Sequence, residues 1–277
     1  MPTTGVAAGL LSALSFGAGD FAGATAARRA GALAVVAGAH GIGLVALLVA
    51  TAAIRPALPD VSAALTGVAA GVAGAIGLAA LYRGMAIGSM GLITALSGAG
   101  SLAVPLVAGA LLGVSTTVVQ LMGVGCVAAA AVAASGASRS EVGRRALLLA
   151  GLAALAFGGW YVLIDLAARG GDPLWALVFS RATSAAVAGL LAIGRIRRRE
   201  YPLRVVVAAG LFDVGGNALY VVARGLMPVG LAAALTGLYP VVTMLLARVL
   251  IGEHLPRIGQ LGVALALLGI VLISAGG

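Results

Sequence analysis

Long apolar runs separated by short polar breaks dominate this chain. Because about 20 apolar residues cross the hydrocarbon core of a bilayer, the pattern predicts ten transmembrane helices, with boundaries good to about three residues. The expected spans are 5–24, 32–54, 63–82, 89–112, 118–136, 146–168, 174–194, 204–222, 228–251 and 256–275. The expected fold class is an all-α integral membrane protein.

Composition supports the same class. Of 277 residues, 62% are hydrophobic and 9% are charged, whereas about a quarter of a soluble domain is charged. Ten spans consume about 200 residues, which excludes a separate soluble domain. Nothing basic precedes the first span, and Arg28 and Arg29 follow it. We therefore expect this helix to stay in the mature protein rather than to be cleaved as a signal peptide.

The charges are unevenly distributed between the two sides of the predicted helices. All 17 basic residues are arginines, against 8 acidic residues, and they are scattered, so we expect no nucleic-acid partner. Loops after the first, third, fifth, seventh and ninth spans form what we call the Arg-rich face. Its thirteen arginines are Arg28, Arg29, Arg83, Arg139, Arg144, Arg145, Arg195, Arg197, Arg198, Arg199, Arg204, Arg248 and Arg257.

Only three arginines, Arg55, Arg169 and Arg224, belong to the loops of the opposite face, and Arg181 lies within a span. Positive loops favour the cytoplasm, so the count predicts a cytoplasmic Arg-rich face and external termini. Cys126 is the only cysteine, which excludes an intrachain disulfide and a multi-cysteine metal or redox site. We expect no cofactor and no metal.

An internal repeat divides the chain into two halves. Residues 91–135 align without gaps on residues 230–274 at a constant offset of 139, and an Arg-Gly pair precedes each copy. This predicts five-helix units over 1–137 and 138–277. Because five is odd, the second unit enters the membrane upside down relative to the first, as in many secondary transporters. Glycines such as Gly67, Gly71 and Gly74 indicate close helix packing whatever the function.

The second copy also carries a recognisable signature. The strings GLAAALTGLYP at 230–240, LIGEHL at 250–255 and QLG at 260–262 resemble EamA-type transporters of the drug/metabolite transporter superfamily. The resemblance implies two inverted five-helix units, a central cavity lined by the first, third, fourth, sixth, eighth and ninth helices, and export or exchange of small metabolites. It also implies cytoplasmic termini, contrary to the charge count.

The two copies differ at three informative positions. Val114 stands opposite Glu253, and Ser101 stands opposite Pro240. His40 matches Arg181 at an offset of 141.

Ionisable residues within the spans are the first candidates for function, because a charge at the bilayer centre costs about 2.5 to 3.5 kcal/mol even on the lenient scale. Asp213 lies near the centre of its span, and Asn217 and Tyr220 follow on the same helical face. Such a stripe indicates a cavity where the acid takes up a proton or a substrate ammonium. The alternative is a buried ion pair that fixes helix packing.

Four further charges lie towards helix ends. Asp20 and His40 lie near the Arg-rich face, and Asp165 and Arg181 near the opposite face. We expect each pair to act as a gate closed on one side of a transport cycle. Static pairs that only offset desolvation are the alternative.

Aromatic and hydroxyl groups complete the candidate set. Trp160, Tyr161, Tyr220 and Tyr239 belong to helices expected at the cavity and would stack on a substrate, whereas Tyr82 is expected as an interfacial anchor. The repeat-related Ser97 and Thr236 would supply cavity hydroxyls, or bond back to the preceding helical turn.

Two other function classes are weighed against transport. Gly17-Ala18-Gly19-Asp20 reproduces the GxGD string of intramembrane aspartyl proteases, with Asp165 as a second acid, but the order of the two acids is reversed. A channel or uncoupled facilitator would need no alternating halves.

We therefore predict a secondary transporter of the cell membrane, not an enzyme, that moves a small organic solute by alternating access. Its expected partners are the solute, the lipid bilayer and coupling protons. It would work as a monomer or a homodimer.

Overall fold

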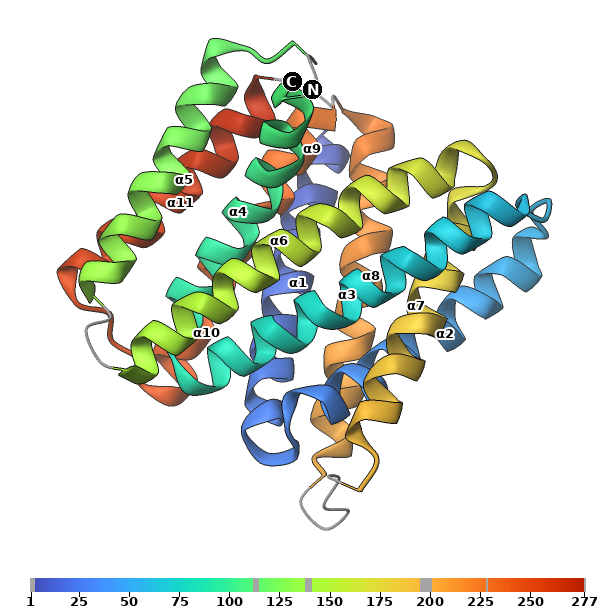
Figure 1. Ribbon diagram of the computed structural model, residues 1–277, viewed down its shortest axis with the longest axis horizontal. Helices are drawn as coiled ribbons and strands as arrows, with labels where there is room; N and C mark the ends of the chain where they lie inside the picture. The colour runs from blue at the N-terminus through green and yellow to red at the C-terminus, as the bar shows by residue number, and fades with distance from the viewer. Residues whose placement is uncertain (1–2, 112–114, 138–140, 195–200, 228, 277) are drawn as a thin grey trace.

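A computed structural model describes residues 3–111, 115–137, 141–194, 201–227 and 229–276 (Figure 1). Helices account for nearly all of these residues. They are α1 (Thr3–Ala30), α2 (Ala32–Ile54), α3 (Val61–Ile87), α4 (Met90–Leu111), α5 (Val118–Ala137), α6 (Glu141–Arg169), α7 (Pro173–Ala192), α8 (Leu203–Leu226), α9 (Val229–Thr236), α10 (Tyr239–Ile251) and α11 (Arg257–Ala275).

These helices confirm the predicted fold class. Within the described residues, nine segments are long and apolar enough to cross a bilayer, and α5 adds a shorter apolar helix. One of the nine segments, Leu231–Ile251, spans parts of both α9 and α10. The predicted span 32–54 coincides with α2, whereas α1 and α3 run on to Ala30 and Ile87.

The ninth crossing is interrupted between α9 and α10. Pro240 has no backbone N–H, so it cannot donate to the carbonyl of Thr236 and the regular ladder stops there. The chain instead makes tighter bonds to the third residue back, from Leu238 N to Leu235 O at 3.3 Å and from Val241 N to Leu238 O at 2.9 Å. In the first unit Ser101 takes the proline's place, and α4 continues through it.

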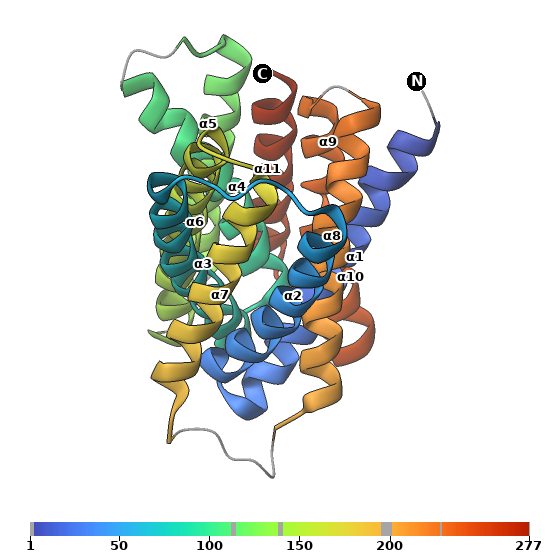
Figure 2. The ribbon, with the colours of Figure 1, turned by 90° about the vertical axis from the view of Figure 1, so that its right-hand side faces the viewer.

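Pairs of helices from the two halves pack along one another. The most extensive contacts outside neighbouring segments join α3 to α6, α1 to α8, α5 to α11, α3 to α7, and α2 to α7. The α5/α11 pair and the α2/α7 pair lie on opposite sides of the molecule (Figure 1). Both termini lie at the same end, as an even number of crossings requires (Figure 2).

Glycine allows these helices to approach closely. A Cβ atom on Gly71 of α3 would lie 2.5 Å from the carbonyl oxygen of Ser180 and 2.6 Å from Cβ of Thr183, both on α7. Gly67 would meet Phe179 of the same helix at 3.1 Å. Of the small residues predicted to form one packing surface on this span, Gly67 and Gly71 therefore form the seam between α3 and α7, whereas Gly74 faces Trp160 of α6 at 3.2 Å.

The buried apolar core lies towards one end of the molecule. Its members come from the last turns of α1, α3, α5, α7 and α10 and from the first turns of α2, α4, α6 and α8, together with α11. Those turns adjoin the Arg-rich face. At the opposite end, a much smaller cluster joins Ala8, Ala223, Met227 and Ala232. The packing therefore closes the Arg-rich end more completely than the other end.

Replacing Gly71 by alanine should destabilise the protein, because the added methyl would overlap the α7 backbone at a cost of about 1–3 kcal/mol. Gly125→Ala on α5 is the matched control, since nothing lies within 4 Å of its Cβ position. Thermal unfolding in detergent should show a lower midpoint for Gly71→Ala and an unchanged or higher one for Gly125→Ala. Equal midpoints would contradict the described α3/α7 seam.

Candidate functional site

An ion pair inside the helix bundle forms the centre of the candidate site. Nη2 of Arg181 on α7 lies 2.7 Å from Oδ2 of Asp213 on α8, and the two side chains are only 11% and 23% exposed. Nη1 of Arg181 also contacts Nε2 of buried His40 on α2. The other ring nitrogen of His40 lies 2.5 Å from the hydroxyl oxygen of Ser184, one turn along α7 from Arg181. Three helices thus meet through one polar network.

Small residues make room for this network. A Cβ on Gly210 of α8 would lie 2.7 Å from the carbonyl oxygen of Ala39 on α2, so these backbones touch next to His40. Gly43, almost one turn further along α2, would meet the Arg181 side chain at 3.9 Å. The guanidinium therefore lies over a glycine surface, where a larger residue would displace it.

A second carboxylate lies nearby on α1. Asp20 Oδ2 accepts a hydrogen bond of 3.2 Å from the hydroxyl of Thr94 on α4, and Asp20 lies within electrostatic range of Asp213. A Cβ on Gly19 would lie 3.5 Å from the backbone nitrogen of Asp213, so α1 and α8 are in direct contact at the two acids. Two carboxylates and one guanidinium therefore share the centre of the bundle.

Tyrosines surround the acids. Tyr239, the first residue of α10, packs edge-on against Phe16 of α1 with ring centroids 6.3 Å apart, and its hydroxyl lies against Gly98 of α4. Tyr82 is buried and its ring covers Gly23 of α1. The expectation that Tyr82 anchors at the interface is therefore wrong. In the sequence, Gly23, one turn after Asp20, indicates that a bulky side chain packs against α1 at this point.

A second aromatic group comes from α6. Trp160 and Tyr161 pack edge-on at 5.2 Å, and Trp160 Nε1 donates a 2.9 Å hydrogen bond to the hydroxyl of Ser180. Tyr161 is partly exposed, yet it lies within electrostatic range of Asp20 and Tyr220.

The remaining candidates make mainly local contacts. The amide of Asn217 donates to the backbone carbonyl of Asp213 at 2.7 Å, and the hydroxyl of Ser97 donates to the Ala150 carbonyl at 3.3 Å. The buried hydroxyl oxygen of Thr236 has no hydrogen-bond partner among the described residues. Of these three side chains, Asn217 lies closest to the acidic network.

The two expected gate pairs do not form. Asp165 binds Arg169 on its own helix at 2.6 Å, with side chains 64% and 73% exposed. Arg181 is instead taken by Asp213, and Asp20 bonds Thr94 rather than His40. Position along a span fixes depth in the membrane but not the direction in which a side chain points, and Asp165 points outward.

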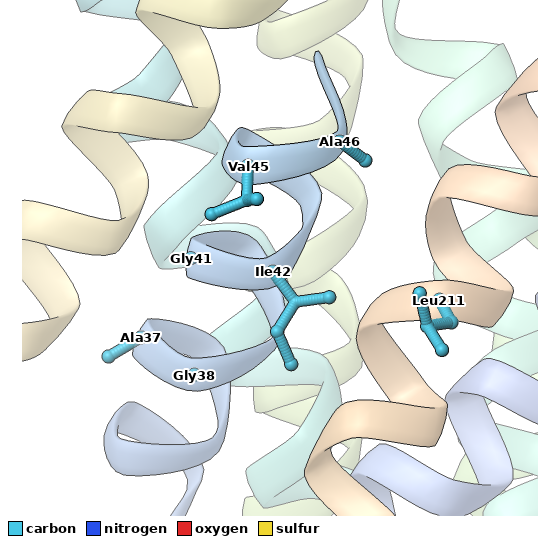
Figure 3. Close-up of a pocket in the computed structure, with 7 residues that line it drawn as sticks. All are labelled: Ala37, Gly38, Gly41, Ile42, Val45, Ala46 and Leu211. Atoms are coloured by element: carbon cyan, nitrogen blue, oxygen red, sulfur yellow. The ribbon is translucent and has the colours of Figure 1, made fainter. Parts of the chain in front are cut away.

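A separate apolar groove runs along the outside of α2 and α8 (Figure 3). It encloses about 420 Å³ and is lined by Ala37, Gly38, Gly41, Ile42, Val45, Ala46 and Leu211. Nothing lies within 4 Å of the Cβ position of Gly41. With only apolar residues on its walls, the groove lacks the groups that would bind a polar solute.

Asp213→Asn should destabilise the protein strongly, because it leaves the Arg181 guanidinium buried without a counter-ion, at a cost of about 3–5 kcal/mol. Asp165→Asn is the matched control, since its pair is exposed to the surroundings and contributes little. Thermal unfolding of both variants checks this. The described network is contradicted if the two midpoints shift equally.

Comparison with known proteins adds the family. Residues 144–275 match the model of the EamA-like transporter family. No curated protein matches the chain in sequence. Eleven chains of solved structures match it. One crystal structure of a protein superposes with a TM-score of 0.60 at 17% identity, covering 99% of this chain and 98% of that one. At that identity the likeness concerns the fold alone.

The family match falls on the half of the chain that carries the predicted signature, and the predicted resemblance is confirmed. Residues 144–275 are therefore similar to the EamA-like transporter family, and the described apolar helices make the protein a multi-pass membrane protein.

Proposed function

We propose that the protein is a secondary active transporter of the cell membrane that exports or exchanges a small organic solute by alternating access. The single observation that carries this is the meeting of Asp20, Arg181 and Asp213 at the centre of the bundle. Asp20 comes from the first proposed unit, and the ion pair comes from the second. A solute bound there contacts both units at once.

The helix pairing supports two inverted units over 1–137 and 138–277. If α6 repeats α1 and α8 repeats α3, then the α1/α8 and α3/α6 contacts are the same contact made twice. The α2/α7 and α5/α11 contacts each join a helix to its own counterpart. Such a pattern is expected from a two-fold axis in the membrane plane, and it lets the units exchange conformations.

The chemistry of the site suggests how a solute is bound. A proton or a solute ammonium competes with Arg181 for Asp213, because all three are cations that stabilise the same carboxylate. Once released, the guanidinium can hold a carboxylate in bidentate fashion. Asp20 offers a further acceptor, and Tyr239 and Tyr161 offer ring faces and hydroxyls. An amino-acid-like solute matches these groups, and proton coupling or exchange follows from the competition.

The uneven packing suggests which half of the cycle is represented. The extended apolar core closes the Arg-rich end, whereas the apolar cluster at the other end has four buried members. We interpret this as a state closed towards the Arg-rich face. If that face is cytoplasmic, as the arginine count predicts, the site is reached from outside in this state.

The alternatives have less support. An aspartyl protease needs two carboxylates that share a proton, but Asp165 lies at the surface with Arg169, and Asp213 is paired with Arg181. A channel or facilitator differs from a coupled transporter in its kinetics. It should show neither saturation nor acceleration of uptake by solute on the far side.

The proposal predicts solute counterflow that depends on Asp213. Purified protein is first screened by thermal shift against amino acids, nucleosides, sugars and cationic dyes, because a bound solute raises the unfolding midpoint. The stabilising compound is then loaded into proteoliposomes, and uptake of its labelled form is followed at several pH values. Uptake should be saturable, accelerated by internal solute and dependent on pH.

In that assay Asp213→Asn should abolish the pH dependence, and Asp165→Asn should retain it. Non-saturable flux without counterflow would favour the channel. Unchanged pH-dependent uptake by Asp213→Asn would contradict the assigned role of this acid.

A further inference from the structure

A contact between the two halves at the Arg-rich end has no part in the solute site. Glu253 follows α10 and is partly buried. Its carboxylate oxygen Oε1 accepts a 2.6 Å hydrogen bond from the hydroxyl of Ser89 and a 3.3 Å bond from Gly91 N, and Oε2 accepts a 3.0 Å bond from Met90 N. These donors are the residue before α4 and the first two residues of that helix. A carboxylate of the second half therefore caps a helix of the first half.

The position of this carboxylate is well defined by its backbone. Gly252 ends α10 in the left-handed conformation, at φ +68°, which glycine adopts without strain. Glu253 N then donates to the Ala247 carbonyl at 3.1 Å. On the other side, Ser89 Oγ accepts from Leu92 N at 3.3 Å. Both partners are held by their own helix ends, so the bond between them ties α10 to α4.

The interaction is also electrostatically favourable. The free N–H groups at a helix start carry a partial positive charge, and hydrogen bonds to an ionised acceptor are about twice as strong as neutral ones. Met90 and the neighbouring Ile93 are buried in the apolar core of the Arg-rich end. The carboxylate therefore acts at the same end as the packing that closes the molecule.

The sequence repeat makes this contact one-sided. At the offset of 139, Val114 stands where the second copy has Glu253. Valine has no side-chain acceptor, so the first copy lacks the carboxylate that makes this contact. The contact between Glu253 and the start of α4 at the Arg-rich face therefore has no equivalent carboxylate in the first copy.

We propose that Glu253 is a conformational clamp, which biases the alternating-access equilibrium towards the state closed at the Arg-rich face. This inference rests on the proposed alternating access, and it adds a reason for the two states to differ in free energy although the units are related by a repeat. Opening that face separates α4 from α10 and leaves the carboxylate and the start of α4 to be solvated separately. Without the clamp, the open state becomes more populated.

Cysteine accessibility tests the clamp. One reporter is Ala95→Cys, because Ala95 is fully buried and lies one turn after Gly91 on α4. Gly91 packs against α10, since a Cβ added to Gly91 would lie 2.8 Å from Met244. The second is Tyr161→Cys, at a partly exposed position beside the central acids. Each is made in a Cys126→Ala background, reconstituted in nanodiscs, and labelled with a hydrophilic maleimide reachable from both faces.

Glu253→Gln and Glu253→Ala are compared with Asp172→Asn. Asp172 also caps a helix, because its carboxylate accepts a 2.8 Å hydrogen bond from Leu174 N. However, Asp172 caps α7, the helix that directly follows it in the chain, and therefore does not join the two halves. In both Glu253 variants, labelling at position 95 should accelerate by about tenfold, as expected from loss of a charge-assisted contact. Labelling at position 161 should slow, because the other end closes. Asp172→Asn should change neither rate, even where it lowers the melting temperature comparably.

The outcomes separate the clamp from the transport model. Unchanged labelling at position 95 in both folded Glu253 variants overturns the clamp and leaves Glu253 as a helix cap. Acceleration at position 95 without slowing at position 161 supports the clamp but contradicts reciprocal opening, and with it the proposed alternating access. Equal acceleration in Asp172→Asn would attribute the effect to general loosening and overturn the clamp.

Discussion

The arrangement of this bundle depends on one requirement: a guanidinium within the membrane must have a counter-charge. For Arg181 the counter-charge is Asp213 at 2.7 Å, and the guanidinium also donates a hydrogen bond to the ring of His40. Those contacts fix the relative rotation of α2, α7 and α8, because each side chain reaches the others only from one helical face. The same requirement makes the site responsive. A proton or a cationic solute that occupies Asp213 also changes the partner of Arg181.

Close helix packing is the second constraint on this bundle. Apolar side chains gain nothing by leaving lipid for one another, so helices in a membrane associate through close backbone approach. Here glycine provides that approach at Gly71 against α7 and at Gly210 against α2. The larger buried side chains gather at the Arg-rich end, and Glu253 adds a polar bond there. One end is therefore closed by both apolar and charged contacts, while the acids remain at the centre.

Much of the fold could be predicted from the sequence, because hydropathy and span length directly reflect the bilayer. The span predicted at 32–54 coincides with α2, and the number of apolar runs predicts the number of membrane crossings. The interruption at Gly237 was also encoded, in Pro240, but a crossing with a break and one without it have the same hydropathy. The site was harder. The sequence identified Asp213, Asp20, His40 and Arg181 as buried charges, yet it paired Arg181 with Asp165. Depth along a span does not give helix rotation, and only the assembled bundle shows that Asp165 faces outward.

The central claim is that Asp213 exchanges Arg181 for a proton or a solute ammonium, and infrared difference spectroscopy tests it most directly. Spectra of the reconstituted protein are recorded between neutral and acidic pH, and with and without the stabilising solute. The account predicts a carboxyl difference signal that is missing from Asp213→Asn and retained in Asp165→Asn. A difference spectrum of Asp213→Asn identical to that of the unaltered protein under both perturbations would contradict it.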